Sequence, residues 1–174
     1  MKNSYRNNFA FKLSASKYHI QQIQNTYKAN RISFESGIDT PEIRPIYYHY
    51  HAVIFELCSA LEMTLQAVND QKELGIEVDK VAWKNQPTRF QQKLLEKNPL
   101  VYSILEEAHS QEWNIALRET RNQLTHRGNI SLQVEFSESG LTIINPIINK
   151  TIFHFDINLW GEEISELFNK LYEE

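Results

Sequence analysis

The chain has 174 residues, of which 41% are hydrophobic, and its formal net charge at pH 7 is −4. This length suits one domain with a substantial core, and the composition excludes a disordered or fibrous chain. The acidic balance argues against a dedicated nucleic-acid-binding domain, which is expected to be basic. The charges are uneven, however, because residues 1–50 hold seven Lys or Arg against three Asp or Glu. A local basic site is therefore compatible with the net charge, since exposed charges are screened beyond about 10 Å.

The sequence also predicts the cellular compartment of the protein. Cys58 is the only cysteine, so no disulfide can form within the chain, and a buried thiol in a reducing compartment is expected. No uninterrupted apolar run approaches the roughly 20 residues of a membrane span. Residues 1–17 have too short and too polar an apolar centre for a secretory signal. We therefore expect a cytoplasmic protein without a membrane segment.

Apolar residues at helical spacing predict helices over most of the chain. In chain order these are about 14–32, about 45–69, 87–97, 99–109 and about 110–127, with a loop rich in turn residues at 33–45. The pattern then alternates, which predicts a small antiparallel β-hairpin or meander over about 130–157, with strands at 130–136 and 150–157. A last amphipathic helix follows. The sequence thus predicts a single domain, residues 1–174, that is mainly α with a β insertion before the C-terminal helix.

The helix predicted at 110–127 has two distinct faces on a wheel of 100° per residue. Its apolar face carries Trp113, Leu117, Thr120 and Leu124. Its polar face carries Arg118, Arg121, Asn122, Thr125 and His126. His126 lies about 160° from Leu124 on this wheel, so a role as a core histidine is not expected.

Ordinary helix capping explains part of this pattern. The ending "THRG" places His126 and Arg127 at the negative end of the helix dipole, and Gly128 can adopt the left-handed conformation that ends many helices. A functional explanation is also open. A guanidinium fork suits phosphate oxygens, an imidazole can exchange protons near neutral pH, and an amide can orient either partner. Together these groups suit cleavage of a phosphodiester without a metal.

The segment "RNQLTHRG", Arg121 to Gly128, resembles the signature of the HEPN superfamily (higher eukaryotes and prokaryotes nucleotide-binding domain). That signature is Arg, a polar residue, a few variable residues and His, near the end of a late core helix. A second pair at similar spacing, Arg44 and His49, has Pro45 after the arginine and begins a helix. The resemblance implies a HEPN-like up-down helical bundle, of which the β insertion is not a minimal part.

The resemblance also implies a function. HEPN proteins include metal-independent endoribonucleases that act as homodimers, in which the 2′-hydroxyl of RNA attacks the adjacent phosphate. Arg121 would bind the phosphate, Asn122 would orient it and His126 would act as acid and base. Arg118, Thr125 and Arg127 would add RNA or phosphate contacts. No cofactor or metal is implied, and a toxin or defence role with an antitoxin or other protein partner is compatible with the family.

Two alternatives remain open from the sequence. One is a non-catalytic HEPN-like module that binds nucleotides or RNA or acts as a scaffold. The other is an unrelated helical protein in which the motif only caps a helix. A metal site is not expected, because Glu106 and His109 form an E-x-x-H pair without the second pair that a di-iron bundle needs. No feature of the sequence supports Cys58 as a nucleophile.

Overall fold

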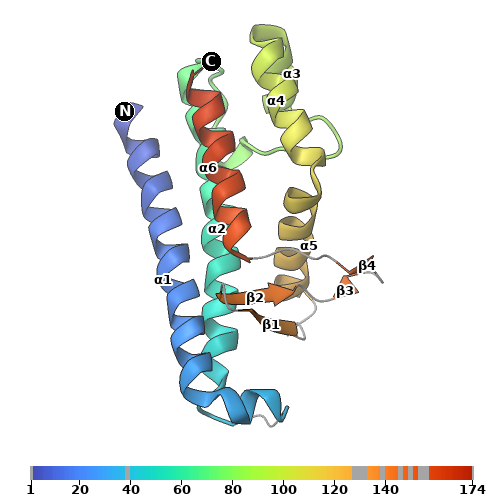
Figure 1. The fold of residues 1–174 in the computed structure, drawn as a ribbon. Coiled ribbons are helices and arrows are strands. Elements are labelled where there is room, and N and C mark those ends of the chain that lie inside the picture. Colours follow the sequence, from blue (N-terminus) through green and yellow to red (C-terminus); the bar gives the residue numbers. More distant parts are fainter. Residues whose placement is uncertain are drawn as a thin grey trace.

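The computed structural model describes residues 2–37, 40–126, 133–137, 140–144, 147–148, 151–152 and 157–173, with side chains described for 4–37, 40–126 and 157–172. The described part is mainly helical and forms a bundle (Figure 1). Its helices are α1 (Lys2–Glu35), α2 (Arg44–Gln71), the 3₁₀ turn η1 (Val78–Lys80), α3 (Arg89–Lys97), α4 (Pro99–Ser110), α5 (Glu112–His126) and α6 (Ile157–Glu173).

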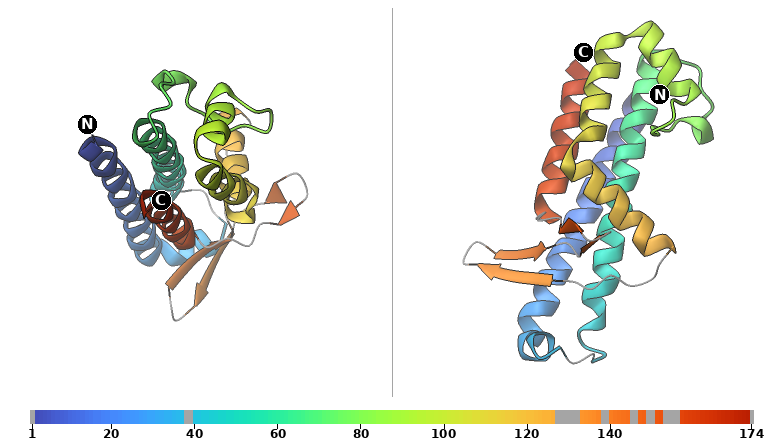
Figure 2. Two further views of the ribbon diagram at one scale, coloured as in Figure 1. Left: turned by 90° about the horizontal axis from the view of Figure 1, so that it is seen from above. Right: turned by 90° about the vertical axis from the view of Figure 1, so that its right-hand side faces the viewer.

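The long helices form the bundle. α1 and α2 make an antiparallel hairpin, α4 and α5 together make the third member, and α6 is the fourth and returns to the end of the bundle where the chain starts (Figures 1 and 2). α2 is the central helix, since it packs against α1, α5 and α6. By length and composition alone α2 could cross a membrane, but core helices meet the same weak criterion, and part of α2 is buried inside the fold. The arrangement therefore places one side of α5 on the core, against α2, α4 and α6.

A single apolar cluster joins the long helices. Tyr50, Ile54 and Leu57 of α2 are buried at helical spacing, as the sequence predicts. Trp160 of α6 is 0% exposed, and its Nε1 donates to the backbone carbonyl of Trp113 at 2.9 Å. This bond satisfies the polar end of a buried indole and ties α6 to the start of α5.

α1 is longer than the predicted helix at 14–32. It begins at Lys2, and its early residue Phe9 stacks on Phe168 of α6 with ring centroids 3.9 Å apart. Contact with α6 therefore stabilises the helix at the start of α1, where the apolar spacing in the sequence is weak. The predicted loop at 33–45 is also shorter in the structure, because α1 continues to Glu35 and α2 begins at Arg44 with Pro45 in its first turn.

The remaining predicted helices are confirmed within one or two residues. Asn98 caps the start of α4, because its side chain accepts a hydrogen bond from the backbone N–H of Val101 at 3.0 Å. At the other end of α4, a break at Gln111, whose backbone is extended (φ −64°, ψ 145°), separates α4 from α5. The break lets α5 take a different direction from α4 over the face of α2 (Figure 2).

Short strands precede α6. β1 (Gln133–Ser137) pairs antiparallel with β2 (Gly140–Ile144), and β3 (Ile147–Ile148) pairs antiparallel with β4 (Thr151–Ile152). The strands that the structure describes form two separate pairs rather than one meander. The strand predicted at 150–157 is described only at Thr151–Ile152, and the rest of it up to residue 156 lies outside the described residues.

Candidate functional site

α5 is oriented by its apolar face. Trp113, Leu117, Thr120 and Leu124 are at most 8% exposed, so the predicted core face is confirmed. The hydroxyl of Thr120 donates to the carbonyl of Ala116 at 2.7 Å, which satisfies its only donor inside the core. The opposite side of the helix is therefore the side presented to solvent.

Arg121, Asn122, Thr125 and His126 are exposed on that opposite side, as the helical wheel predicts. The hydroxyl of Thr125 donates to the carbonyl of Arg121 at 2.8 Å, so its proton is used within the helix. α5 ends at His126. Arg127 and Gly128 lie outside the described residues, and the predicted contact of Arg127 and the predicted cap at Gly128 remain predictions.

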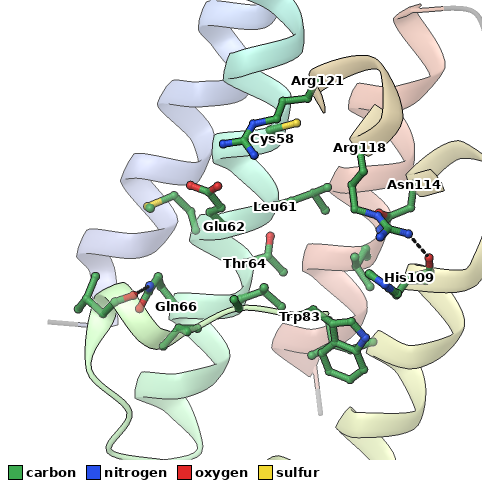
Figure 3. Close-up of a pocket in the computed structure, with 18 of the residues that line it drawn as sticks. Cys58, Leu61, Glu62, Thr64, Gln66, Trp83, His109, Asn114, Arg118 and Arg121 are labelled. Atoms are coloured by element: carbon green, nitrogen blue, oxygen red, sulfur yellow. Dashed lines mark hydrogen bonds between the residues drawn. The ribbon is translucent and has the colours of Figure 1, made fainter. Parts of the chain in front are cut away.

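A cavity of about 560 Å³ lies beside this face, a volume within the usual range for small-molecule pockets (Figure 3). Its walls come from α2, from η1 and the segment after it, from the end of α4, from α5 and from Leu167 of α6. Arg118, Arg121 and Asn122 are among the lining residues, whereas Thr125 and His126 are not. The structure thus brings two of the three predicted catalytic residues to one cavity and leaves the third beyond it.

Arg118 has a different environment from the other motif residues. It is only partly exposed, its Nε donates to Asn114 Oδ1 at 3.0 Å, and its Nη2 donates to the backbone carbonyl of His109 at 3.0 Å. Burial lowers the pKa of Arg118 from its ordinary value. The side chain therefore joins α5 to the last turn of α4 across the break at Gln111, and it is not part of the solvated face on which the wheel places it.

His109 lines the cavity as a neutral imidazole. Burial, and then the positive charge of Arg118, lower the pKa of His109 to about 4. Its Nε2 lies 3.3 Å from Asn85 Oδ1, while Glu106 accepts a hydrogen bond from the hydroxyl of Tyr102 at 3.3 Å. The two residues of the E-x-x-H pair therefore have separate partners.

Cys58 lies beside Arg121 at one end of the cavity (Figure 3). Burial raises the pKa of Cys58 to about 12, and the nearby charge of Arg121 opposes this only in part. A thiol that stays protonated at neutral pH is a weak nucleophile, which agrees with the structural role expected from the sequence.

Gln66 and Trp83 are cavity residues that the predicted motif does not include. Gln66 of α2 is 5% exposed, and Trp83 follows η1 and lies with its ring centroid 6.2 Å from that of His109. The sequence alone could have indicated Gln66 as a candidate site residue, because it is a polar residue in the apolar run "LQAV" of a buried helix face. The sequence does not indicate Trp83 as a site residue, because it precedes α3 in a segment without regular structure.

No protein-family model matches the chain, and neither a curated protein nor a solved structure does. The functional inference therefore rests on the exposed face of α5 and on the cavity beside it.

Proposed function

We propose that the protein is a metal-independent endoribonuclease with a HEPN-like bundle, acting in the cytoplasm as a homodimer through Arg121, Asn122 and His126. The observation that supports this most is the shared exposure of these three side chains on one face of α5, with Arg121 and Asn122 at a cavity. Helix capping accounts for a histidine in the last turn. Capping does not require Arg121 and Asn122, which lie more than one helical turn before His126, to line a cavity.

The proposed reaction uses the nucleophile that RNA carries. His126 removes the proton of the 2′-hydroxyl, and the 2′-oxygen attacks the adjacent phosphorus while the bond to the 5′-oxygen breaks. The products are a 2′,3′-cyclic phosphate and a 5′-hydroxyl, whose oxygen takes up a proton. The guanidinium of Arg121 stabilises the negative charge that grows on the phosphate oxygens, and Asn122 orients the phosphate.

The homodimer follows from the proton transfers. One imidazole cannot easily take a proton from the 2′-oxygen and give one to the 5′-oxygen in the same step, because these oxygens lie on opposite sides of the phosphorus. A second copy would bring its own histidine to the leaving group. The exposed end of α5, where His126 lies outside the cavity, leaves that side chain accessible to a substrate held between two copies.

The test is cleavage of varied RNAs in the presence of EDTA by wild type, His126→Ala and Arg121→Ala. We expect each variant to lower the rate about 100-fold or more, and the wild-type products to end in 2′,3′-cyclic phosphates. Arg89→Ala is the matched control, because Arg89 is an exposed arginine on α3. Unchanged cleavage in both variants, or no cleavage by wild type on any RNA, would exclude the nuclease.

A non-catalytic RNA- or nucleotide-binding module is the second candidate. The position of His126 favours it, because this residue is absent from the cavity that Arg121 and Asn122 line. Binding and cleavage measured on the same samples separate the two candidates. RNA binding that Arg121→Ala weakens and His126→Ala leaves unchanged, without any cleavage by wild type, selects the binding module.

A further inference from the structure

We propose that the side of the α1–α2 hairpin that faces away from the core is a dimer interface, which the same surface of a second copy covers. Phe11 and Tyr18 of α1 and Tyr48 and Phe55 of α2 define this surface, the aromatic face. The inference rests on the homodimer of the proposed function, and it names the surface through which the two copies meet.

The four aromatic side chains are unusually exposed for their size. Phe11 is 66% exposed, Tyr18 59%, Tyr48 67% and Phe55 41%. A single exposed apolar residue is common on a protein surface, whereas several adjacent large ones mark an interaction surface. Whether these four residues form one surface therefore depends on how α1 packs against α2.

Two contacts between α1 and α2 fix that packing. Lys12 Nζ lies 2.9 Å from Glu56 Oε2, and His19 Nδ1 lies 2.9 Å from His49 Nδ1. Both pairs are seven residues apart on each helix, which is two turns, so the two contacts lie on the same seam of the antiparallel hairpin.

The aromatic face follows from these contacts, because each of its residues directly precedes one of the four contact residues. One step back along an α-helix turns a side chain by 100°, and in two antiparallel helices both turns point to the same side of the pair. The two phenylalanines therefore lie at one level of the hairpin and the two tyrosines two turns away, all on one side. Tyr50 and Leu57, which directly follow the contact residues of α2, turn the other way and are buried in the core.

Charged residues are rare around the aromatic face. The α2 positions one turn from Tyr48 or Phe55 include Arg44 and no Lys, Asp or Glu, and burial lowers the pKa of His51, which keeps it uncharged at neutral pH. Phosphate groups and charged peptides are held by opposite charges, so neither suits this surface. The α1 positions one turn from Phe11 or Tyr18 carry no charge and are Asn7, Asn8, Ser14, Ala15, Gln21 and Gln22.

A second copy of the chain fits this surface. The cores of protein interfaces are rich in aromatic residues and poor in charges. Amides and hydroxyls such as those around the rings both donate and accept hydrogen bonds, so an identical surface can pair with them across a two-fold axis. The exposed parts of the four aromatic side chains amount to roughly 450 Å² per copy, or about 900 Å² in a dimer. The surrounding side chains supply the rest of the roughly 1,200 Å² at which stable interfaces begin.

The aromatic face borders the candidate site. Glu62 lies seven residues after Phe55, so it is on the same side of α2, and it lines the cavity that Arg121 also lines. Cys58, one turn from Phe55, lies beside Arg121 (Figure 3). A copy seated on the aromatic face therefore lies next to the cavity, on the side from which the proposed reaction needs a second histidine.

The test is the molar mass of the protein in solution, measured by sedimentation equilibrium between about 1 and 100 µM chain. We expect the wild type to reach the mass of two chains. Phe11→Glu/Tyr48→Glu should raise the dissociation constant about 100-fold, because aromatic contacts are lost and like charges from both copies meet. Leu100→Glu is the matched control, since Leu100 is 55% exposed on α4, and it should leave the dissociation constant unchanged.

A mixture of two variants separates charge repulsion from misfolding. Phe11→Lys/Tyr48→Lys should also be monomeric alone, because its lysines repel those of an identical copy. Mixed in equal amounts with Phe11→Glu/Tyr48→Glu, it should form a dimer, because the two surfaces now carry opposite charges. A misfolded variant would not regain a partner in this way.

The outcomes separate this interface from the nuclease. A wild type that stays monomeric at about 100 µM, a dimer that both double variants retain, or a mixture that stays monomeric overturns the interface even if the wild type cleaves RNA. Monomeric wild type that sediments with phosphatidylcholine vesicles would overturn it too, and would assign the aromatic face to a lipid surface. A dimer that the double variants lose and the mixture regains supports the interface even if no RNA is cleaved, and in that case the nuclease alone is excluded.

Discussion

Arg118 and Arg121 lie three residues apart on α5 and have different environments. Both line the cavity, but Arg118 is partly buried and donates to Asn114 and to the carbonyl of His109, whereas Arg121 is exposed. A guanidinium with two fixed acceptors holds two helices together, and an exposed one can bind a ligand. Arg118 thus has a structural role in addition to the phosphate contact that the sequence predicts, and that contact and the role proposed for Arg121 both remain predictions.

Arg118→Met should therefore destabilise the fold much more than Arg121→Met. We expect Arg118→Met to lower the free energy of unfolding by about 2 kcal/mol, because it leaves Asn114 Oδ1 and a helix-terminal carbonyl without their donor. Arg121→Met should change it by about 0.5 kcal/mol or less, as for most exposed positions. Urea unfolding followed by circular dichroism measures both. Equal losses would contradict the structural role of Arg118.

The start of α3 holds the segment that carries Trp83. Gln91 is 3% exposed, and its Oε1 accepts from the backbone N–H groups of Lys84 and Thr88 at 3.1 and 3.0 Å. Its Nε2 donates to the carbonyl of Lys84 at 3.0 Å, and the Thr88 hydroxyl donates to the carbonyl of Ala82 at 2.8 Å. With Thr88 these bonds form a capping box, so the start of α3 also fixes one wall of the cavity.

Gln91→Leu should loosen this wall. It leaves two backbone N–H groups and one carbonyl without partners, so we expect the free energy of unfolding to fall by about 2 kcal/mol or more. The neighbouring Gln92→Leu, on the exposed side of α3, should change it by about 0.5 kcal/mol or less. Hydrogen exchange should also quicken at Lys84 and Thr88 in Gln91→Leu. Protection that stays at the wild-type level would show that the segment does not depend on Gln91.

Partly buried histidines on several helices make the stability of the whole fold depend on pH. Burial lowers the pKa of His49 of α2, and the nearby His19 of α1, 2.9 Å away between the two Nδ1 atoms, lowers it further. Burial also lowers the pKa of His51 and, together with Arg118, that of His109 to about 4. A histidine pair joined through ring nitrogens needs one neutral ring as acceptor, so neutral histidines belong to the native state.

The sign of the pH dependence follows from these shifts. The unfolded histidines take up protons near pH 6.5, and the folded ones do so at lower pH. Stability present above pH 6.5 is therefore lost as the pH falls towards 4. His109→Gln should show a shallower loss over this interval, measured as thermal midpoints from pH 8 to pH 4. Parallel profiles for wild type and His109→Gln would contradict the assignment.

Much of the helical content could be predicted from the sequence, because local chemistry sets it. The apolar spacing of α2, Pro45 at its start and Asn98 with Pro99 at the start of α4 act within a few residues. The same holds for α5, where the 100° step per residue sets Leu124 on the core face and His126 on the exposed face. The exposure of Arg121, Asn122, Thr125 and His126 was predictable because it needs one helix and no partner.

Other features depend on contacts between segments that are distant in the chain. Helix at the start of α1 is supported by Phe168, which lies far along the chain, and Arg118 is partly buried because α4 ends beside it. The cavity brings Gln66, Trp83 and Arg121 together from three separate segments. No local sequence pattern predicts that these three residues line one cavity, because this depends on how the helices pack. Local spacing thus predicts the core face of α5 and the exposure of Arg121, Asn122, Thr125 and His126, because both follow from the helical repeat. The packing of α2, the end of α4 and the segment after η1 against α5 sets the cavity beside these residues and the partial burial of Arg118.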